Sequence, residues 1–220
     1  THHNYTYRHS MMVSGYLISF ALLLGIRGQD LQNVAVGGIL HDIGKALIPL
    51  GILDKPGPLN QEEWQEMRKH PTHSRKIMMG SDCHPSVIGG CVHHHEKLDG
   101  TGYPDGLKGN EISDIARMVA IADVFSGLTE KRSYKPSLSN KKAYDIMLSM
   151  DGHLDLDLVS AFKPSAIHCI SWSSFIRLSI AAYVLLLTNS SPPILCIHSE
   201  WSSAKCVGIM YVASKIEFIY

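Results

Sequence analysis

The chain has 220 residues, of which 45% are apolar, so it is long enough to form a domain of ordinary size around its own core. Lys plus Arg and Asp plus Glu number 20 each, and this balance excludes the overall basic field of a protein that binds DNA or RNA polymers. The five cysteines are odd in number and form no Cys-x-x-Cys pair, which argues against a disulfide framework and favours a reducing, cytoplasmic compartment.

Charged residues divide the chain into two unequal parts. The first 163 residues contain 35 of them, and the remainder of the chain contains only five. We therefore expect a folded domain at 1–163 and a tail at 164–220 that is a different kind of sequence, such as the product of a frameshift. The apolar run 175–187 has 13 residues, short of the roughly 20 that cross a bilayer, so we expect no membrane span.

The first predicted elements are two helices. Apolar residues recur at three- and four-residue spacing over 9–24, which predicts an amphipathic helix with His9 in its first turn. Asp30 is a candidate cap for a second helix. That helix should deliver His41 and Asp42 at its C-terminal end.

The next region combines a loop with three helices. The Pro- and Gly-rich stretch 49–59 predicts an ordered loop. Asn60 is expected to cap a helix that ends near His70, and a further helix is expected over 72–79. A helix starting at Pro85 should then bring two adjacent residues, His94 and His95, to its C-terminal part.

The last predicted elements complete an all-α pattern. Turn residues over 100–109 predict a loop, and the apolar helix that follows it contains Asp123. Further helices are expected over 140–147 and 154–162. Because no segment shows clear apolar and polar alternation, we predict no strand.

Histidines and acids in this pattern favour a metal site over incidental polar residues. Taken singly, His9 or His70 has an ordinary reading as a surface residue at a helix end. The adjacent pair His94 and His95 is harder to dismiss, since neighbours on a helix point about 100° apart and can face two metals. Asp123 also favours a metal site, because burying an unpaired carboxylate costs several kcal/mol. The other histidines and the five cysteines are expected to be surface or structural residues.

These residues occur in an order that resembles the HD-GYP family, a branch of the HD-domain metal-dependent phosphohydrolases. The matching runs, in chain order, are His9, His41-Asp42-Ile43-Gly44-Lys45, Lys55-Pro56-Gly57, His70-Pro71, His94-His95-Glu96, Asp99-Gly100-Thr101-Gly102-Tyr103-Pro104 and Asp123. The resemblance covers roughly 1–163 and implies an all-α HD-domain helical bundle with a binuclear metal site. It leaves the low-charge tail unmatched.

The resemblance implies hydrolysis of cyclic di-GMP to pGpG, and onward to GMP, by a metal-activated hydroxide in bacterial second-messenger signalling. Two divalent metals about 3.5–4 Å apart can activate water and neutralise the phosphoryl oxygens together. By similarity Asp42 bridges the metals, and the remaining ligands would be His9, His41 and Asp123 on one ion and His70, His94 and His95 on the other. Iron or manganese suits such imidazole and carboxylate ligands, and zinc or nickel is not excluded.

The resemblance also implies the residues that meet the substrate. Lys45 would act with Asp42 in catalysis by stabilising phosphate charge or assisting a proton transfer. Arg132 and Lys135 would contact phosphate, with Tyr134 packing on a base. Gly102, Tyr103 and Pro104 would shape the substrate loop, and Glu96 and Asp99 would orient that loop or the ligands.

Two departures from the family pattern qualify this expectation. Tyr5 stands where some members place the Glu of a third metal, which favours a two-metal site. Ser126 stands where many members have Asp, so turnover is less secure than metal binding. The alternatives are an HD-type phosphohydrolase acting on another nucleotide and a catalytically weak signalling module that binds metal and ligand. A helical scaffold with incidental histidines is remote.

The expected partners follow from the same resemblance. Because the chain starts at Thr1 without a methionine, we expect that a sensory or receiver domain, as in two-component signalling, precedes it in the whole protein. The resemblance leaves a homodimer open.

Overall fold

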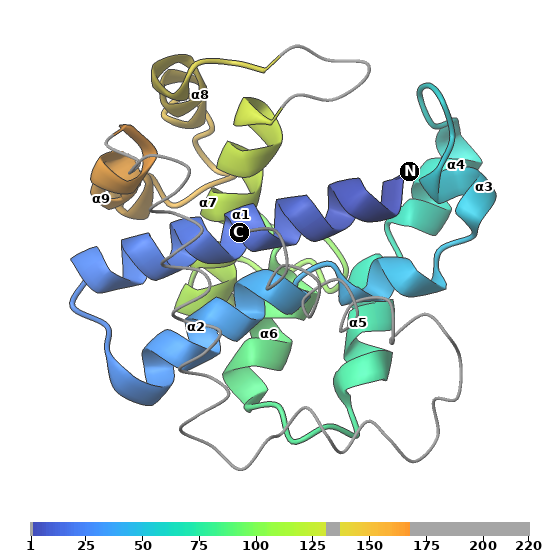
Figure 1. Cartoon of the computed structure of the whole chain (residues 1–220), viewed down its shortest axis with the longest axis horizontal. Helices are drawn as coiled ribbons and strands as arrows, with labels where there is room; N and C mark the ends of the chain where they lie inside the picture. The colour runs from blue at the N-terminus through green and yellow to red at the C-terminus, as the bar shows by residue number, and fades with distance from the viewer. Residues whose placement is uncertain (1, 131–136, 168–220) are drawn as a thin grey trace, which may run out of the picture.

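A computed structural model of the chain describes residues 2–130 and 137–167, and these form an all-helical bundle (Figure 1). No strand occurs among them, so the all-α prediction is confirmed. The elements in chain order are α1 (His2–Leu23), α2 (Gly28–Leu40), the 3-10 helix η1 (Ile43–Leu47), α3 (Leu50–Leu53), α4 (Gln61–Met67), α5 (His70–Met78), α6 (Pro85–His93), the 3-10 helix η2 (Gly109–Glu111), α7 (Asp114–Thr129), α8 (Asn140–Met147) and α9 (Leu156–Ile167).

The main core lies around α1, which runs across the molecule and contacts α2, α7 and α9 (Figure 1). Aromatic rings from three helices meet there. Tyr16 and Phe20 of α1 pack edge-on against Phe125 of α7 and Phe162 of α9, with ring centroids 5.0 Å apart for Tyr16 and Phe125 and 5.2 Å for Phe20 and Phe162. Edge-to-face contacts of this kind add to the stabilisation from apolar burial. This packing holds α1 and α7 together, and both helices carry candidate site residues.

A second, smaller core supports the other half of the site. Met78 of α5 packs with Val87 and Cys91 of α6, and all three side chains are buried. Through this cluster and its contacts with α2 and α7, α6 is fixed beside the ends of α2 and α5.

Some predicted element boundaries are confirmed and others are wrong. Asn60 caps α4 with a reciprocal capping box, as expected. Asp30 lies in the first turn of α2, and Arg27 is the N-cap residue, so the predicted cap is wrong. The predicted loop 49–59 contains the short helix α3, which begins directly after Pro49. The helix expected to end near His70 ends at Met67, and His70 is the first residue of α5.

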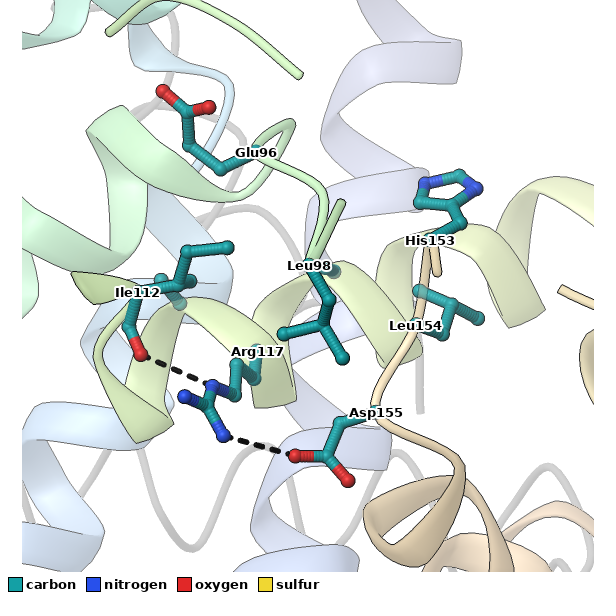
Figure 2. A pocket seen from close by; sticks show the side chains of 9 residues that line it. Glu96, Leu98, Ile112, Arg117, His153, Leu154 and Asp155 are labelled. Carbon is teal, nitrogen blue, oxygen red and sulfur yellow. Dashed lines mark hydrogen bonds and ion pairs between the residues drawn. The ribbon is translucent and has the colours of Figure 1, made fainter. Parts of the chain in front are cut away.

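Residues that line a small pocket beside α7 hold the loop around η2 in place (Figure 2). Arg117 donates from Nε to the carbonyl of Ile112 at 3.0 Å and from a terminal nitrogen to Asp155 at 3.0 Å. In Figure 2 the carboxylate of Glu96 points away from this ion pair. Arg117 therefore joins α7 to the loop before it and to the start of α9.

None of the described helices is both long and apolar enough to cross a membrane. The apolar run 175–187 lies outside the described residues.

Candidate metal centre

The structure brings all seven predicted metal ligands together from separate elements. The side chains come from α1 (His9), the turn after α2 (His41, Asp42), the start of α5 (His70), the turn after α6 (His94, His95) and α7 (Asp123), so His94 and His95 lie just beyond the helix expected to carry them. They form three groups in which the potential ligand atoms lie within 4.8 Å of one another, namely His9 with His41 and Asp123, His41 with Asp42 and His94, and His70 with His94 and His95. Because the middle group shares a residue with each of the others, the seven side chains make one continuous centre.

Three of the histidines are oriented by the same backbone contact. The Nδ1 atoms of His41, His70 and His94 lie 2.8, 2.9 and 2.8 Å from the carbonyl oxygen three residues earlier in the chain. A carbonyl only accepts, so each Nδ1 carries the proton and each Nε2 presents a lone pair. In most metal-binding histidines, the ring nitrogen that does not bind the metal donates such a hydrogen bond.

The atoms left over by these contacts fit a metal. Within the part of the chain that the structure describes, Nε2 of His41, His70 and His94 and Oδ1 of Asp42 are buried without a hydrogen-bond partner. Leaving a buried polar atom unpaired costs about 1–3 kcal/mol, so four in one place are unfavourable without a ligand. Divalent cations would satisfy all four atoms, because each offers a lone pair and none offers a proton.

Asp42 lies between the two halves of the centre. Its Oδ2 is 3.3 Å from Nε2 of His41 and 2.5 Å from Nζ of Lys45, and its Oδ1 is 3.4 Å from Nε2 of His70. Burial raises the pKa of Asp42, but the charge of Lys45 and the contact with His41 outweigh burial and hold the pKa well below its usual range. The carboxylate is therefore ionised, with one oxygen directed at each half.

The sequence around Asp42 allows this position only with glycine at residue 44. A Cβ on Gly44 would lie 2.5 Å from the backbone nitrogen of Ser74 and collide with the carbonyl oxygen of His70. The Gly44 N–H also donates to Oγ of Ser74 at 3.0 Å. The turn after α2 thus packs directly on α5 and brings Asp42 next to His70.

His9 and Asp123 form an ion pair in the structure. Nε2 of His9 lies 2.9 Å from Oδ1 of Asp123, and Nδ1 lies 3.0 Å from Oε2 of Glu130. Burial lowers the pKa of His9, but the hydrogen bonds to the two carboxylates outweigh burial and raise the pKa to about 9. The pKa of Asp123 is held well below its usual range, because His9 outweighs the raising effect of burial.

The second group of histidines, which consists of His70, His94 and His95, is neutral at physiological pH. Burial is the largest cause that lowers the pKa of His70 to about 3 and of His95 to about 4. Burial also places the pKa of His94 well below its usual range. Neutral imidazole is the form that binds metal, so these residues are ready to act as ligands without losing a proton.

The predicted substrate loop lies against this second group. The ring of Tyr103 stacks on His95, with centroids 4.9 Å apart and planes 26° apart. Glu96 is buried and accepts hydrogen bonds from three backbone N–H groups at 105–107, between 2.7 and 3.1 Å. A Cβ on Gly102 would collide with the backbone of Glu96. The glycine therefore lets the loop pack directly on the end of α6.

Arg132, Tyr134 and Lys135 lie outside the described residues, and so does the side chain of Tyr5. His93, expected to be peripheral, contacts Asp105 of the loop at 3.0 Å.

Two residues of the site were not predicted from the sequence. Glu130 contacts His9, and the guanidinium carbon of Arg68 lies 5.4 Å from the ring centroid of Tyr103. Glu130 is an acid beside two basic residues, which reads as a solvated charge run. Arg68 is an exposed residue just after α4, and only its distance of two residues from His70 hinted at a role.

Known proteins share both the sequence pattern and the fold. The chain is 38% identical over 165 residues to a cyclic di-GMP phosphodiesterase of Pseudomonas aeruginosa, covering 74% of this chain and 39% of that protein. It is 38% identical over 143 residues to the 3'3'-cGAMP-specific phosphodiesterase 3 of Vibrio cholerae, covering 65% of this chain and 31% of that protein. The chain thus spans about a third to two fifths of the length of these relatives.

Among solved structures, an HDG"Y"P protein of Bdellovibrio bacteriovorus matches with a TM-score of 0.58 and 25% identity, over 71% of this chain and 51% of that one. A cyclic GMP-AMP phosphodiesterase of Vibrio cholerae has the same TM-score of 0.58 at 15% identity, over 80% of this chain and 48% of that one, which shows a shared fold. The family description "HD domain" matches residues 2–158. The chain therefore belongs to the HD-domain family, within the HD-GYP branch that its motifs predicted.

Proposed function

We propose that this chain hydrolyses the phosphodiester bonds of cyclic di-GMP to give pGpG, and then GMP. The observation that carries the proposal is the continuous centre of seven imidazole and carboxylate side chains with unpartnered, buried Nε2 and Oδ1 atoms. Phosphodiester hydrolysis needs an activated water and positive charge against the phosphoryl oxygens. The relative from Pseudomonas aeruginosa, named a cyclic di-GMP phosphodiesterase, supports this choice of substrate.

Two divalent ions are the proposed cofactors. His9, His41 and Asp123 would hold one, His70, His94 and His95 the other, and Asp42 would bridge them. When bound, the ions supply Lewis-acid charge and an activated water nucleophile. A donor set of imidazole and carboxylate without thiolate suits iron or manganese.

Lys45 is the proposed catalytic cation. Its side chain is 27% exposed, and its ammonium group lies beside the centre, paired with Asp42. From there it can reach a phosphoryl oxygen and stabilise the charge that grows as the water oxygen bonds to phosphorus and the phosphorus–O3′ bond breaks. The O3′ leaving group takes up the proton as the linear dinucleotide forms.

The loop beside the second group is the proposed recognition surface. Tyr103, set by Gly102 and Pro104 and stacked on His95, offers an aromatic face for a base or sugar. Arg68 beyond it offers a guanidinium to phosphate or guanine. We propose Arg132 and Lys135 as further phosphate contacts.

A second substrate, 3'3'-cGAMP, has support of its own. The relatives from Vibrio cholerae named 3'3'-cGAMP-specific phosphodiesterases 1 and 3 are also 38% identical to this chain. The two dinucleotides differ in one base, so the choice between them rests on contacts to that base.

The test is hydrolysis of both dinucleotides by one preparation. The chain is stripped of metal, loaded with Mn²⁺ or Fe²⁺, and incubated with cyclic di-GMP or 3'3'-cGAMP while the products are separated by chromatography. We expect pGpG and GMP from cyclic di-GMP, and no product from Asp42→Ala. Faster cleavage of 3'3'-cGAMP would overturn the preferred substrate, and a metal-loaded chain that cleaves neither would overturn the proposed function.

A further inference from the structure

His9 is held differently from the other oriented histidines of the centre. In His41, His70 and His94, Nδ1 contacts a backbone carbonyl three residues earlier. In His9, Nδ1 lies 3.0 Å from Oε2 of Glu130 and 3.2 Å from Oγ of Ser126. His9 therefore depends on side chains for an orientation that His41, His70 and His94 obtain from the main chain.

These two contacts of Nδ1 come from the C-terminal end of α7. Ser126 is fully buried in the last turn, and Glu130, whose side chain is 14% exposed, follows the helix. The backbone N–H of Glu130 donates to the carbonyl of Ser126 at 2.9 Å, which fixes Glu130 relative to α7. Asp123, one turn earlier on the same helix, contacts the other nitrogen of His9 at 2.9 Å.

A carboxylate behind an imidazole acts differently from a carbonyl. Both accept the Nδ1 proton, but the carboxylate also carries charge, which makes the imidazole a stronger donor to a metal at Nε2. A serine hydroxyl can accept the same proton but adds no charge.

We propose that Glu130 is a positioning residue for the metal held by His9, His41 and Asp123. It fixes the proton of His9 on Nδ1, directs Nε2 toward the ion and strengthens binding at that half of the centre alone. Ser126 is a secondary acceptor that does not replace the charge. This inference rests on the proposed metal centre, but it concerns binding and not turnover.

The experiment titrates Mn²⁺ into chelator-stripped protein and resolves the affinities of the two ions. We expect Glu130→Ala to bind one ion as the wild type does and the other about 10–100-fold more weakly. Glu130→Gln keeps an oxygen that accepts from Nδ1 and should lie between the two. Asp145→Ala, which removes an exposed carboxylate of α8, is the matched control and should bind both ions normally.

Assignment of the affected ion uses His95→Ala, which weakens the other group. In that background Glu130→Ala should weaken the remaining ion by the same factor. If Glu130→Ala fails to fold in chelator, Glu130→Gln carries the test, and wild-type affinity for both ions would overturn the proposal. Equal weakening of both ions would also overturn it.

The titration separates this proposal from the proposed function. Two bound ions without cleavage of any cyclic dinucleotide would end the proposed function and leave the role of Glu130 intact. Unchanged affinity in Glu130→Ala would end the role of Glu130 whatever the activity.

Discussion

Asp42 and Lys45 are close neighbours with separate proposed tasks. Asp42 is 4% exposed and faces both groups of histidines, so the geometry of the centre depends on it. Lys45 contacts Asp42, but it carries none of the buried, unpartnered atoms that could bind metal, and its side chain is partly exposed to solvent. Metal binding and rate should therefore respond differently to changes at these two positions.

We predict that Asp42→Ala loses metal and activity together, whereas Lys45→Ala keeps the metal and loses rate. Removing one group that stabilises transition-state charge costs about 10²–10³ in kcat. Metal content by elemental analysis and kcat on cyclic di-GMP, measured on the same samples, check both parts. Equal loss of metal in the two variants would contradict the role given to Lys45.

The metal-free protein should lose stability as the pH rises from about 6.5 to 9. His9 has an ordinary pKa of 6.5 and a folded-state pKa of about 9, so the folded chain binds this proton more tightly than the unfolded chain. The stabilisation is complete below pH 6.5 and disappears as the pH passes 9, with an upper bound of about 3 kcal/mol. The lowered pKa values of His70 and His95 affect stability only at lower pH.

Thermal unfolding in excess chelator at several pH values in this window measures the effect. His9→Gln removes the titrating group, so its melting temperature should change much less between pH 6.5 and 9. Parallel curves for the variant and the wild type would show that His9 is not the cause.

At the scale of elements, the end of α6 organises both the centre and the substrate loop. His94 is the C-cap of the helix and contributes to the metal ligands, and the buried Glu96 follows it. The three N–H groups that Glu96 accepts would otherwise be without partners in the loop at 105–107. Tyr103 belongs to the same loop, so the position of its ring depends on Glu96.

We predict that Glu96→Ala destabilises the fold by about 2–4 kcal/mol and raises KM more than it lowers kcat. The cost arises because several backbone donors lose a buried, charged acceptor. Glu111→Ala is the control, since this exposed glutamate accepts from one N–H at 2.8 Å and should cost less than about 1 kcal/mol. Urea unfolding and steady-state kinetics measure the two effects, and equal losses in the two variants would contradict the prediction.

The elements that sequence patterns predicted well are those whose residues have one clear use. Asn60 caps its helix as expected, and the structure adds that Glu63 completes a capping box with it. Gly102 was expected in a loop, and the backbone contact with Glu96 requires a residue without Cβ. The meeting of distant histidines could be anticipated only through the resemblance, because periodicity carries no information on which helix ends are neighbours.

The elements that were missed depend on local choices with several solutions. Proline at residue 49 indicates a break in regular helix, and it also suits the position before a helix. The sequence pattern therefore does not distinguish α3 from a loop. Asp30 has a cap-forming side chain but lies inside the first turn of α2, where an acid is equally favourable. The contact of Glu130 with His9 joins residues 121 positions apart, and no local pattern encodes it.

At the scale of the whole molecule, the position of α1 links stability to the site. One part of this helix packs in the aromatic core with α7 and α9, and its earlier part carries His9 into the centre. Within the described residues, α9 thus supports the ligands through its packing on α1. The C-terminal boundary of the folded domain therefore depends on α9.

The predicted domain boundary at 163 falls inside α9, which extends to Ile167. Ser165 and Ala166 are 3% and 0% exposed. The amide of Asn140 donates to the carbonyl of Ala166 at 2.8 Å, and Ser19 donates to Ser165 at 3.2 Å. A chain that stops at 163 lacks these buried contacts, whereas a chain that stops at 167 keeps them.

We predict that the chain 1–167 unfolds at the same urea concentration as the full chain. The chain 1–163 should be less stable by about 1–3 kcal/mol, the range expected for losing two partly buried hydrogen bonds and a small apolar side chain. Comparison of all three chains by urea unfolding tests whether 168–220 contributes to the domain. If 1–167 is insoluble, or as weak as 1–163, the tail stabilises the domain, and its interpretation as a frameshift product is wrong.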